Sequence, residues 1–180
     1  MDFELICQLM TETHCLKHPP ASSQLEIRRI EGRDADGVLL CLSNAFAPFR
    51  AQYTDGAWAD TVMNPETLRQ RMEEMTVLVA VDATHDVIGT IGYKVEAGLA
   101  HIRGMAVVQS SHGSRVAKLL LDRVEIELIK AGCRSLTLDT TRPLRRAIRF
   151  YEKNGFRATG KVSEFYGMEL ITYRKEISTE

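Results

Sequence analysis

The chain lacks any apolar run close to the roughly 18 residues that a membrane-spanning helix requires. Its first four residues (MDFE) are acidic in balance, whereas a secretory signal begins with a basic segment. The cysteines share no C-x-x-C spacing, so they indicate neither a zinc site nor a disulfide framework; they are Cys7, Cys15, Cys41 and Cys133. We therefore expect a reduced, cytoplasmic protein with no membrane partner and no metal.

An excess of basic charge is also absent. The chain has 23 Lys and Arg against 24 Asp and Glu, for a net charge of −1, whereas nucleic-acid-binding domains usually carry a strong basic excess. No internal repeat or low-complexity tract is visible. The 180 residues, 44% of them hydrophobic, fit one globular domain with a substantial core.

The first 23 residues differ in character from the rest. A mildly amphipathic run leads into His18-Pro19-Pro20-Ala21-Ser22-Ser23, which is a poor helix and a plausible linker. We interpret residues 1–23 as an N-terminal extension that packs on the body or on a second subunit, which leaves a homodimer open. Residues 24–180 form the predicted domain.

Hydrophobic periodicity in the body predicts alternating strands and helices. Strands are expected at 24–30, 77–81, 87–95, 99–108, 136–140, 156–164 and 168–177, and helices at 34–46, 64–74, 113–131 and 143–155. Asp34 is expected to cap the first helix, and Asn64-Pro65 to begin the second. The segment 47–63 reads as turn-rich. This order suits an α+β fold whose mixed, mostly antiparallel sheet has helices on both faces.

The stretch from Gly104 onward carries most of the functional information. An apolar strand ends at Val108, a polar turn spans Gln109–Ser114, and a long amphipathic helix follows. The first turn of a helix presents unpaired backbone N–H groups at the positive end of the helix dipole, which suits a diphosphate. We therefore expect a phosphate-bearing cofactor here.

Two motifs resemble the GNAT superfamily of acyl-CoA-dependent N-acyltransferases. The first is Met105-Ala106-Val107 followed by His112-Gly113-Ser114-Arg115-Val116-Ala117-Lys118, and the second is Ala147 to Phe156, with Tyr151 at its centre. In the family the first motif holds the cofactor, so the resemblance implies that its residues bind acetyl-CoA. His112 replaces the usual Arg or Gln, Arg115 replaces the usual Gly, and Leu144 stands where many members have an Asn that contacts the cofactor. Thr140, Thr141 or Arg142 would then supply that contact.

The resemblance implies an N-acetyltransferase that transfers an acetyl group from acetyl-CoA to a primary amine by direct attack in a ternary complex. Tyr151 would protonate the departing thiolate, and an N–H of Ala106 or Val107 would bind the oxyanion. For the base, Asp139, His101 and a chain of water molecules all remain open. The family often has a β-bulge in the cofactor strand, which the sequence alone does not reveal.

The acceptor amine is not readable from the sequence. The resemblance places its wall at residues 46–63, where Phe49, Tyr53 and Trp58 either stack on a substrate or pack in the core. A small amine, an amino acid, an antibiotic and a protein N-terminus all stay open. A non-catalytic acyl-CoA sensor is the alternative function. A dinucleotide-binding domain fits poorly because the glycine pattern is incomplete.

Overall fold

The computed structural model describes residues 25–177, and the extension predicted over residues 1–23 lies outside that range. The strands are β1 (Glu26–Arg29), β2 (Thr76–Val81), β3 (Val87–Glu96), β4 (Leu99–Val107), β5 (Ser135–Thr141), β6 (Arg157–Phe165) and β7 (Met168–Glu176). The α-helices are α1 (Ala35–Phe46), α2 (Asp55–Thr61), α3 (Pro65–Glu74), α4 (Val116–Lys130) and α5 (Arg145–Lys153). The 3₁₀ turns are η1 (Gly32–Asp34), η2 (Ala47–Gln52) and η3 (Gln109–Ser111).

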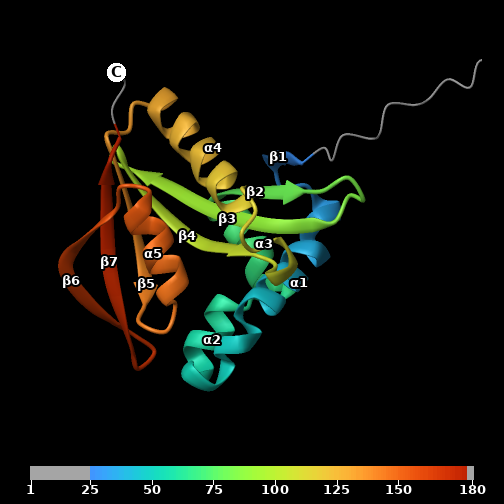
Figure 1. Ribbon diagram of the computed structural model, residues 1–180, viewed down its shortest axis with the longest axis horizontal. Helices are drawn as coiled ribbons and strands as arrows, with labels where there is room; N and C mark the ends of the chain where they lie inside the picture. The colour runs from blue at the N-terminus through green and yellow to red at the C-terminus, as the bar shows by residue number, and fades with distance from the viewer. Residues whose placement is uncertain (1–24, 178–180) are drawn as a thin grey trace, which may run out of the picture.

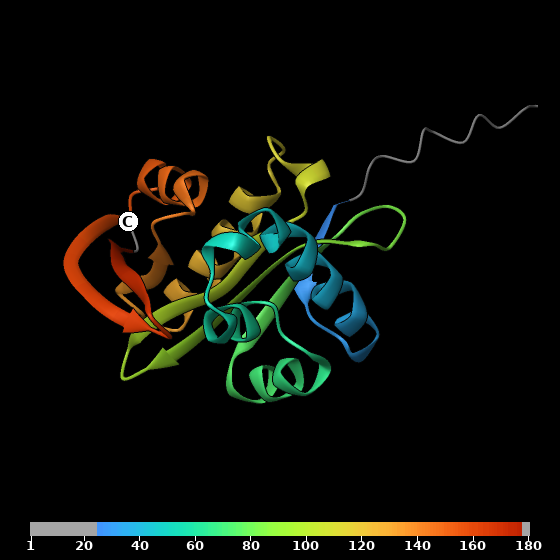
Figure 2. The same cartoon turned by 90° about the horizontal axis from the view of Figure 1, so that it is seen from below.

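The strands form one seven-stranded sheet in the order β1-β2-β3-β4-β5-β7-β6 (Figure 1). Neighbouring strands are antiparallel except β4 and β5, which pair in parallel. Helices α4 and α5 cover one face and α1 to α3 cover the other; Figure 2 shows α5 (orange) and α3 (green) on opposite sides of the sheet. The predicted α+β fold, with a mostly antiparallel sheet and helices on both faces, is confirmed.

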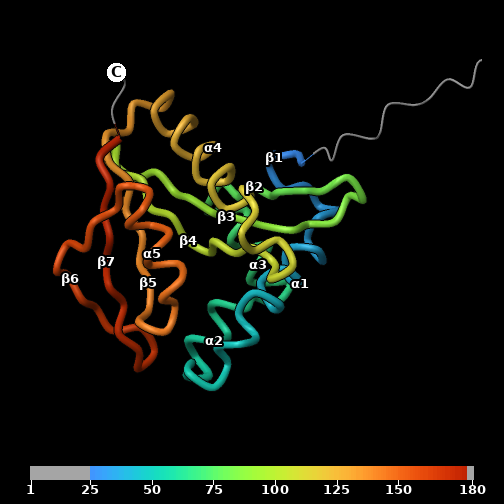
Figure 3. Tube along the Cα trace, in the orientation of Figure 1, coloured from blue at the N-terminus to red at the C-terminus, as the bar shows by residue number. Residues whose placement is uncertain are grey.

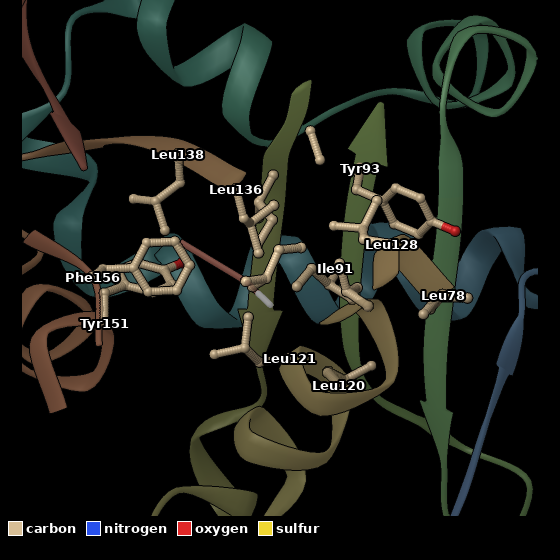
Figure 4. Close-up of a cluster of buried hydrophobic side chains, with 14 of the residues drawn as sticks. Leu78, Ile91, Tyr93, Leu120, Leu121, Leu128, Leu136, Leu138, Tyr151 and Phe156 are labelled. Carbon is tan, nitrogen blue, oxygen red and sulfur yellow. The ribbon is translucent and has the colours of Figure 1, made fainter. Parts of the chain in front are cut away.

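The larger core lies between the sheet and helices α4 and α5 (Figure 4). Helical spacing places Leu120, Val124 and Leu128 on one face of α4, and all three are fully buried against the sheet. Tyr151 of α5 packs edge-to-face on Phe156, with ring centroids 5.6 Å apart. Both rings belong to the core cluster that contains Leu136 and Leu138 of β5, so they pack α5 on the sheet near β5, where the candidate site lies.

Several local signals in the sequence predicted their elements correctly. Asn64 caps α3, accepting a hydrogen bond from the Thr67 N–H at 2.9 Å, and Pro65 occupies the first helical position. Tyr166 and Gly167 both have positive φ values, 49° and 82°, as a tight hairpin between β6 and β7 requires. Gly132, with φ of 77°, follows the end of α4, where a glycine with positive φ commonly terminates a helix.

Two local predictions were wrong. Asp34 stands before α1, but its carboxylate accepts hydrogen bonds from the Arg28 guanidinium (2.6 and 2.9 Å) and the Glu31 N–H (2.7 Å) instead of capping the helix. Arg28 attracts it because Asp34 is only 6% exposed and a buried carboxylate needs a charged partner. The segment 47–63 is not turn-rich: it contains η2 and then α2, which the Thr54 hydroxyl caps.

The parallel pair β4–β5 comes apart part-way along its length. Its register runs from Leu99 beside Ser135 to Ile102 beside Leu138 and stops there, and the strands diverge below this point in Figure 1. At the same level β4 carries a bulge, because Arg103 pairs with Gly92 and Ala106 with Thr90, which leaves one extra residue in β4. Gly104 accommodates the bulge with φ of 69°. The sheet is therefore open between the ends of β4 and β5.

Candidate active site

A cavity of about 660 Å³ lies where β4 and β5 diverge. It is lined by eleven of the thirteen residues that the sequence motifs single out: His101, Met105, Ala106, Val107, His112, Gly113, Ser114, Ala117, Lys118, Asp139 and Tyr151. Residues from α1, α2 and α3 line it as well. The cavity therefore touches elements on both faces of the sheet, and it connects the turn before α4 with a polar pocket near α2 and α3.

The turn before α4 forms one end of the cavity, and Figure 3 traces the chain from β4 through η3 into the helix. Among the residues that the structure describes, none accepts a hydrogen bond from the N–H groups of Gly113, Arg115, Ala117 and Lys118. These donors lie in the loop and the first turn of a 15-residue helix, where its dipole is positive. The turn can thus bind an anion through its backbone.

Two of the predicted cofactor residues do not line the cavity. Arg115 is exposed at the N-cap of α4, with φ of −84° and ψ of 0°. The Val116 side chain is 3% exposed and packs in the core, and its N–H already donates a hydrogen bond to the Ser114 hydroxyl at 3.3 Å. Of these two residues, only Arg115 keeps a backbone N–H that is available to a cofactor.

His112 forms a hydrogen bond with Arg146, a residue that the sequence motifs did not indicate. Its Nε2 lies 3.1 Å from the carbonyl oxygen of Val107, which can only accept, so Nε2 carries the proton. Its Nδ1 then accepts a hydrogen bond from Arg146 Nη1 at 3.2 Å. Both nitrogens of His112 are occupied by protein partners, and Arg146 lines the cavity beside the turn. Its guanidinium adds positive charge where the free N–H groups gather.

Tyr151 lies in the middle of the cavity wall. Its side chain is 7% exposed, and among the described residues its hydroxyl donates only to the Met105 sulfur, at 3.5 Å, a weak acceptor. Burial raises the pKa of the Tyr151 phenol well above its usual value. The phenol therefore keeps its proton at neutral pH and can donate a hydrogen bond to a group that enters beside β4.

The two candidate bases lie together on the other side of the opening. His101 Nε2 is 3.8 Å from Asp139 Oδ2, and His101 Nδ1 is 3.0 Å from the Thr137 hydroxyl oxygen. That hydroxyl donates its own proton to the Ala100 carbonyl at 3.0 Å, so it must accept from His101 Nδ1–H. The unprotonated nitrogen of His101 is therefore Nε2, which lies toward Asp139.

Electrostatics keep this imidazole neutral. Burial is the main cause that lowers the pKa of His101, with Arg103 and Lys161 adding to it and Asp139 opposing it. Because the pKa of His101 is lowered from its ordinary value, Nε2 is free to accept a proton at pH 7.

The end of the cavity near α2 and α3, which we call the acceptor end, contains three charged residues that the sequence analysis did not single out: Asp60, Arg71 and Arg103. Phe49 and Tyr53, which it did name, also line the cavity. The Tyr53 hydroxyl lies 3.0 Å from the Thr141 hydroxyl, and its ring packs against those of Phe46 and Trp58. Trp58 does not line the cavity. Packing thus accounts for Trp58, while Phe49 and Tyr53 face the space where a substrate could lie.

Comparison with known proteins identifies the family. The model of the acetyltransferase (GNAT) domain matches residues 47–177, which is 131 of the 180 residues. The chain belongs to the GNAT acetyltransferase family. It is therefore an acyltransferase, and acetyl-CoA is its acyl donor. No protein of curated function matches the chain significantly in sequence.

Solved structures share the fold of this GNAT domain at low sequence identity. A GNAT-family acetyltransferase from Staphylococcus aureus Mu50 has a TM-score of 0.72 at 16% identity, covering 86% of this chain and 100% of its own. PaiA N-acetyltransferase from Thermoplasma acidophilum, solved with coenzyme A, has a TM-score of 0.71 at 21% identity, covering 85% and 99%. The Escherichia coli ribosomal-protein-S18-alanine N-acetyltransferase has a TM-score of 0.70 at 18% identity, covering 87% and 96%.

The GNAT cavity fits acetyl-CoA in its shape and in its polar groups. The unpaired N–H groups of the α4 turn suit the diphosphate, and the divergence of β4 and β5 leaves room for an extended arm beside β4. Thr140 lines this passage, is 4% exposed, and has a hydroxyl with no hydrogen-bond partner among the described residues. Such a buried hydroxyl needs a partner.

Thr140, Thr141 and Arg142 are the residues expected to substitute for the asparagine that Leu144 replaces, and their hydrogen bonds differ. Thr141 is already engaged with Tyr53, and Arg142 pairs with Glu169 at 2.6 Å on the surface. Of these three residues, Thr140 alone is buried, at the cavity and without a partner among the residues that the structure describes. Its hydroxyl is therefore the one that is available to the cofactor.

None of the helices of this GNAT domain, within residues 25–177, is long and apolar enough to span a membrane.

Proposed function

We propose that the protein is an N-acetyltransferase that transfers the acetyl group directly to a primary amine while donor and acceptor are bound together. The observation that carries this function is the continuity of the cavity. Its wall contains the phosphate-binding turn and Tyr151 from one side of the sheet, and His101 and Asp139 from the other. Donor and acceptor can therefore meet at the opening between β4 and β5.

Acetyl-CoA supplies an acetyl thioester, whose attack by an amine forms an amide and releases a thiol. His101 Nε2 is placed to accept a proton from the amine, because this nitrogen is unprotonated, His101 lines the cavity and its imidazole is neutral. The imidazolium that forms is stabilised by Asp139 Oδ2 at 3.8 Å. Asp139 acts in this scheme as a partner of His101 and not as the base itself.

The negative charge that develops on the carbonyl oxygen needs a donor, and the Val107 N–H is the better of the two candidates. Val108 N–H donates to the Ile88 carbonyl at 3.0 Å, so the alternation of an antiparallel pair directs Ala106 N–H toward β3 and Val107 N–H away from it. Because β5 no longer pairs with β4 at this level, Val107 N–H faces the opening. A fixed donor at that point favours the transition state.

Covalent transfer through either of the two cysteines in residues 25–177 has little support. Neither Cys41 nor Cys133 lines the cavity, and both are buried. Burial raises the pKa of the Cys41 thiol to about 12, so it is not a thiolate at neutral pH. Direct attack by the amine is therefore the better route.

The test of the proposed function is thiol release from acetyl-CoA in the presence of a panel of primary amines. Amine-dependent release, with the acetylated amine found by mass spectrometry, would support direct N-acetyl transfer. Initial rates that give a pattern of intersecting double-reciprocal lines are expected for a ternary complex. Parallel lines would indicate a covalent intermediate and refute direct attack.

Gly113→Val should weaken acetyl-CoA binding selectively. Gly113 has φ of 84°, and a Cβ there would meet nothing within 4 Å, so valine disturbs only the backbone, by about 1–2 kcal/mol. Relaxation of this strain would misdirect the free N–H groups of the turn. The rise in melting temperature that acetyl-CoA causes in the native protein should therefore be strongly reduced.

Gly98→Val is the matched control. Gly98 has φ of 78°, also has nothing within 4 Å, and lies in the β3–β4 hairpin and not on the cavity wall. The two variants should lose similar stability, but Gly98→Val should keep the full shift with acetyl-CoA. Equal shifts in both variants would mean that this turn does not bind the diphosphate.

A further inference from the structure

Two arginines share one carboxylate at the acceptor end of the cavity. Arg103 of β4 directs Nη2 at both carboxylate oxygens of Asp60, at 2.6 and 2.7 Å. Arg71 of α3 lies farther away: its Nη2 is 3.8 Å from Asp60 Oδ2 and 3.4 Å from the Asp60 carbonyl oxygen. The three side chains together carry one surplus positive charge, because an arginine in a protein does not lose its proton.

Arg71 is the member of this group whose charge is least compensated. Its side chain is 11% exposed and lines the cavity, and among the residues described its only hydrogen bond is the 3.4 Å contact, although a guanidinium has five donors. Burial and the nearby Arg103 lower the pKa of Arg71, and the charges of Asp60 and Glu74 offset this only in part, which reflects the cost of holding this charge away from water. An anion in the cavity would satisfy both its charge and its donors.

Arg71 also lies close to the reacting centre. A Cβ on Gly104 would come within 3.1 Å of Arg71 Nη1, so the guanidinium packs on the bulge of β4 itself. His101 and Arg103 are two residues apart on β4 and both line the cavity, so their side chains point to the same face about 7 Å apart. The acceptor end thus has a basic nitrogen and a carboxylate at one side and a cationic group at the other.

A purely structural role explains Arg71 less well. Linking α2 to β4 requires only the pair of contacts that Arg103 makes with Asp60, and these already neutralise that carboxylate. Burying Arg71 as well costs desolvation free energy, and its Nη2 gains little attraction from Asp60 Oδ2 at 3.8 Å. The arrangement is better explained by a negatively charged group that enters the cavity beside the amine.

Building on the N-acetyltransferase function proposed above, we propose that the acceptor is a free amino acid, whose amine lies at His101 and Asp139 and whose carboxylate is bound by Arg71. A guanidinium holds a carboxylate through two parallel hydrogen bonds, so it would also fix the amine in position. A peptide N-terminus, by contrast, has a neutral amide carbonyl where the free amino acid has its carboxylate.

The test compares each L-amino acid with its own carboxamide as acceptor, by thiol release from acetyl-CoA. The carboxamide keeps the size and the amine but removes the charge. For the best acceptor, kcat/KM of the acid is expected to exceed that of the amide at least tenfold. Arg71→Gln should raise KM for the acid about 10- to 100-fold and leave the amide almost unaffected, because the deleted guanidinium interacts with the carboxylate alone.

Arg69→Gln is the matched control. Arg69 is on the same helix, is exposed, and pairs with Glu73 at 2.8 Å away from the cavity, so its loss should leave the acid-to-amide ratio unchanged. Arg71→Lys keeps the charge without the planar fork, and it should retain part of the preference. This second variant keeps the comparison available if Arg71→Gln does not fold.

A binding measurement separates this inference from the function on which it rests. In the presence of coenzyme A, an N-acetyl amino acid should raise the melting temperature of the native protein more than its amide does, and Arg71→Gln should abolish that difference. Equal rates and equal shifts for acid and amide would overturn the carboxylate site while leaving N-acetyl transfer intact. If no amine causes thiol release, the proposed function fails, and the shifts alone then decide whether Arg71 binds a carboxylate.

Discussion

Tyr151→Phe is expected to slow acetyl transfer roughly ten- to a thousand-fold while leaving acetyl-CoA affinity nearly unchanged. The change removes only the hydroxyl, whose sole partner within residues 25–177 is the Met105 sulfur at 3.5 Å, and it keeps the ring that packs on Phe156. Single-turnover rates with saturating amine would measure the effect on the chemical step, and a separate binding measurement would show whether acetyl-CoA affinity is unchanged. Because the deleted hydrogen bond is weak, stability should change by less than about 1 kcal/mol.

The raised pKa of Tyr151 defines how this hydroxyl acts. A thiol has a pKa of about 8.5, far below that of the buried phenol, so complete proton transfer to the thiolate would be uphill. Tyr151 is therefore expected to donate a hydrogen bond to the developing negative charge on sulfur. The pH–rate profile should accordingly contain no ionisation of Tyr151 below about pH 10, its unperturbed value.

Tyr93→Phe is the control for this substitution. Tyr93 lies in the same core, but its hydroxyl donates to Glu127 at 2.6 Å and it does not line the cavity. Its loss should reduce stability more than the loss of the Tyr151 hydroxyl and leave the rate unchanged. A normally folded Tyr151→Phe protein with full activity would mean that water, and not Tyr151, stabilises the departing thiolate.

The donor half of the site was predictable because its residues follow one another in the sequence. One continuous segment contains the last residues of β4 from Met105, the turn at Gly113 and the start of α4. Tyr151 lies on the short helix α5, and Ala147, Tyr151 and Gly155 recur at intervals of four residues. Backbone N–H groups at a helix start depend little on side-chain identity. The departures at His112 and Arg115 therefore leave the turn able to bind an anion.

The acceptor half was not predictable in the same way. Asp60, Arg71 and Arg103 come from α2, α3 and β4, and only the folded sheet places them in one pocket. The bulge at Gly104 likewise depends on register, since a glycine inside a strand signals either a bulge or a close approach of another group. Gly104 does both: it lies in the bulge of β4, and the Arg71 guanidinium packs closely against it.

The sequence offered no basis for choosing between His101 and Asp139 as the base. The directions of the hydrogen bonds favour His101. Thr137 commits its proton to the Ala100 carbonyl, which fixes the His101 tautomer through two contacts of 3.0 Å. Asp139 accepts from the Thr172 hydroxyl at 2.6 Å and lies beside His101 Nε2. None of these relations follows from spacing along the chain.

His101→Gln is expected to lower kcat/KM at pH 7 roughly 100-fold or more, in line with the usual size of general-base effects. Burial lowers the pKa of His101 from the ordinary value for histidine, so the base is unprotonated at pH 7 and the acidic limb of the native profile should lie at lower pH than for an exposed histidine. In the variant this limb should disappear. Measuring kcat/KM from about pH 5 to 10 on both proteins would reveal the difference.

The loss of kcat/KM in His101→Gln should also become smaller as the pH rises. Without a base, the variant relies on amine that is already neutral, and that fraction rises about tenfold per pH unit up to the amine pKa of about 8–10. The ratio of native to variant rates should therefore be largest near neutral pH and shrink at alkaline pH. Thr137→Val, which removes the acceptor for His101 Nδ1–H, should cause a smaller loss and keep the acidic limb.

Asp139→Asn distinguishes the base from its partner. If Asp139 only stabilises the His101 imidazolium across 3.8 Å, its loss should cost less than that of His101 and shift the acidic limb to lower pH, since Asp139 raises the pKa of His101. Asp139 would be the base if two results were found together: Asp139→Asn lowers kcat/KM more than His101→Gln does, and the acidic limb of the pH profile is retained in His101→Gln. Because the Thr172 hydroxyl can donate to an amide oxygen as well as to a carboxylate, Asn should keep the local geometry.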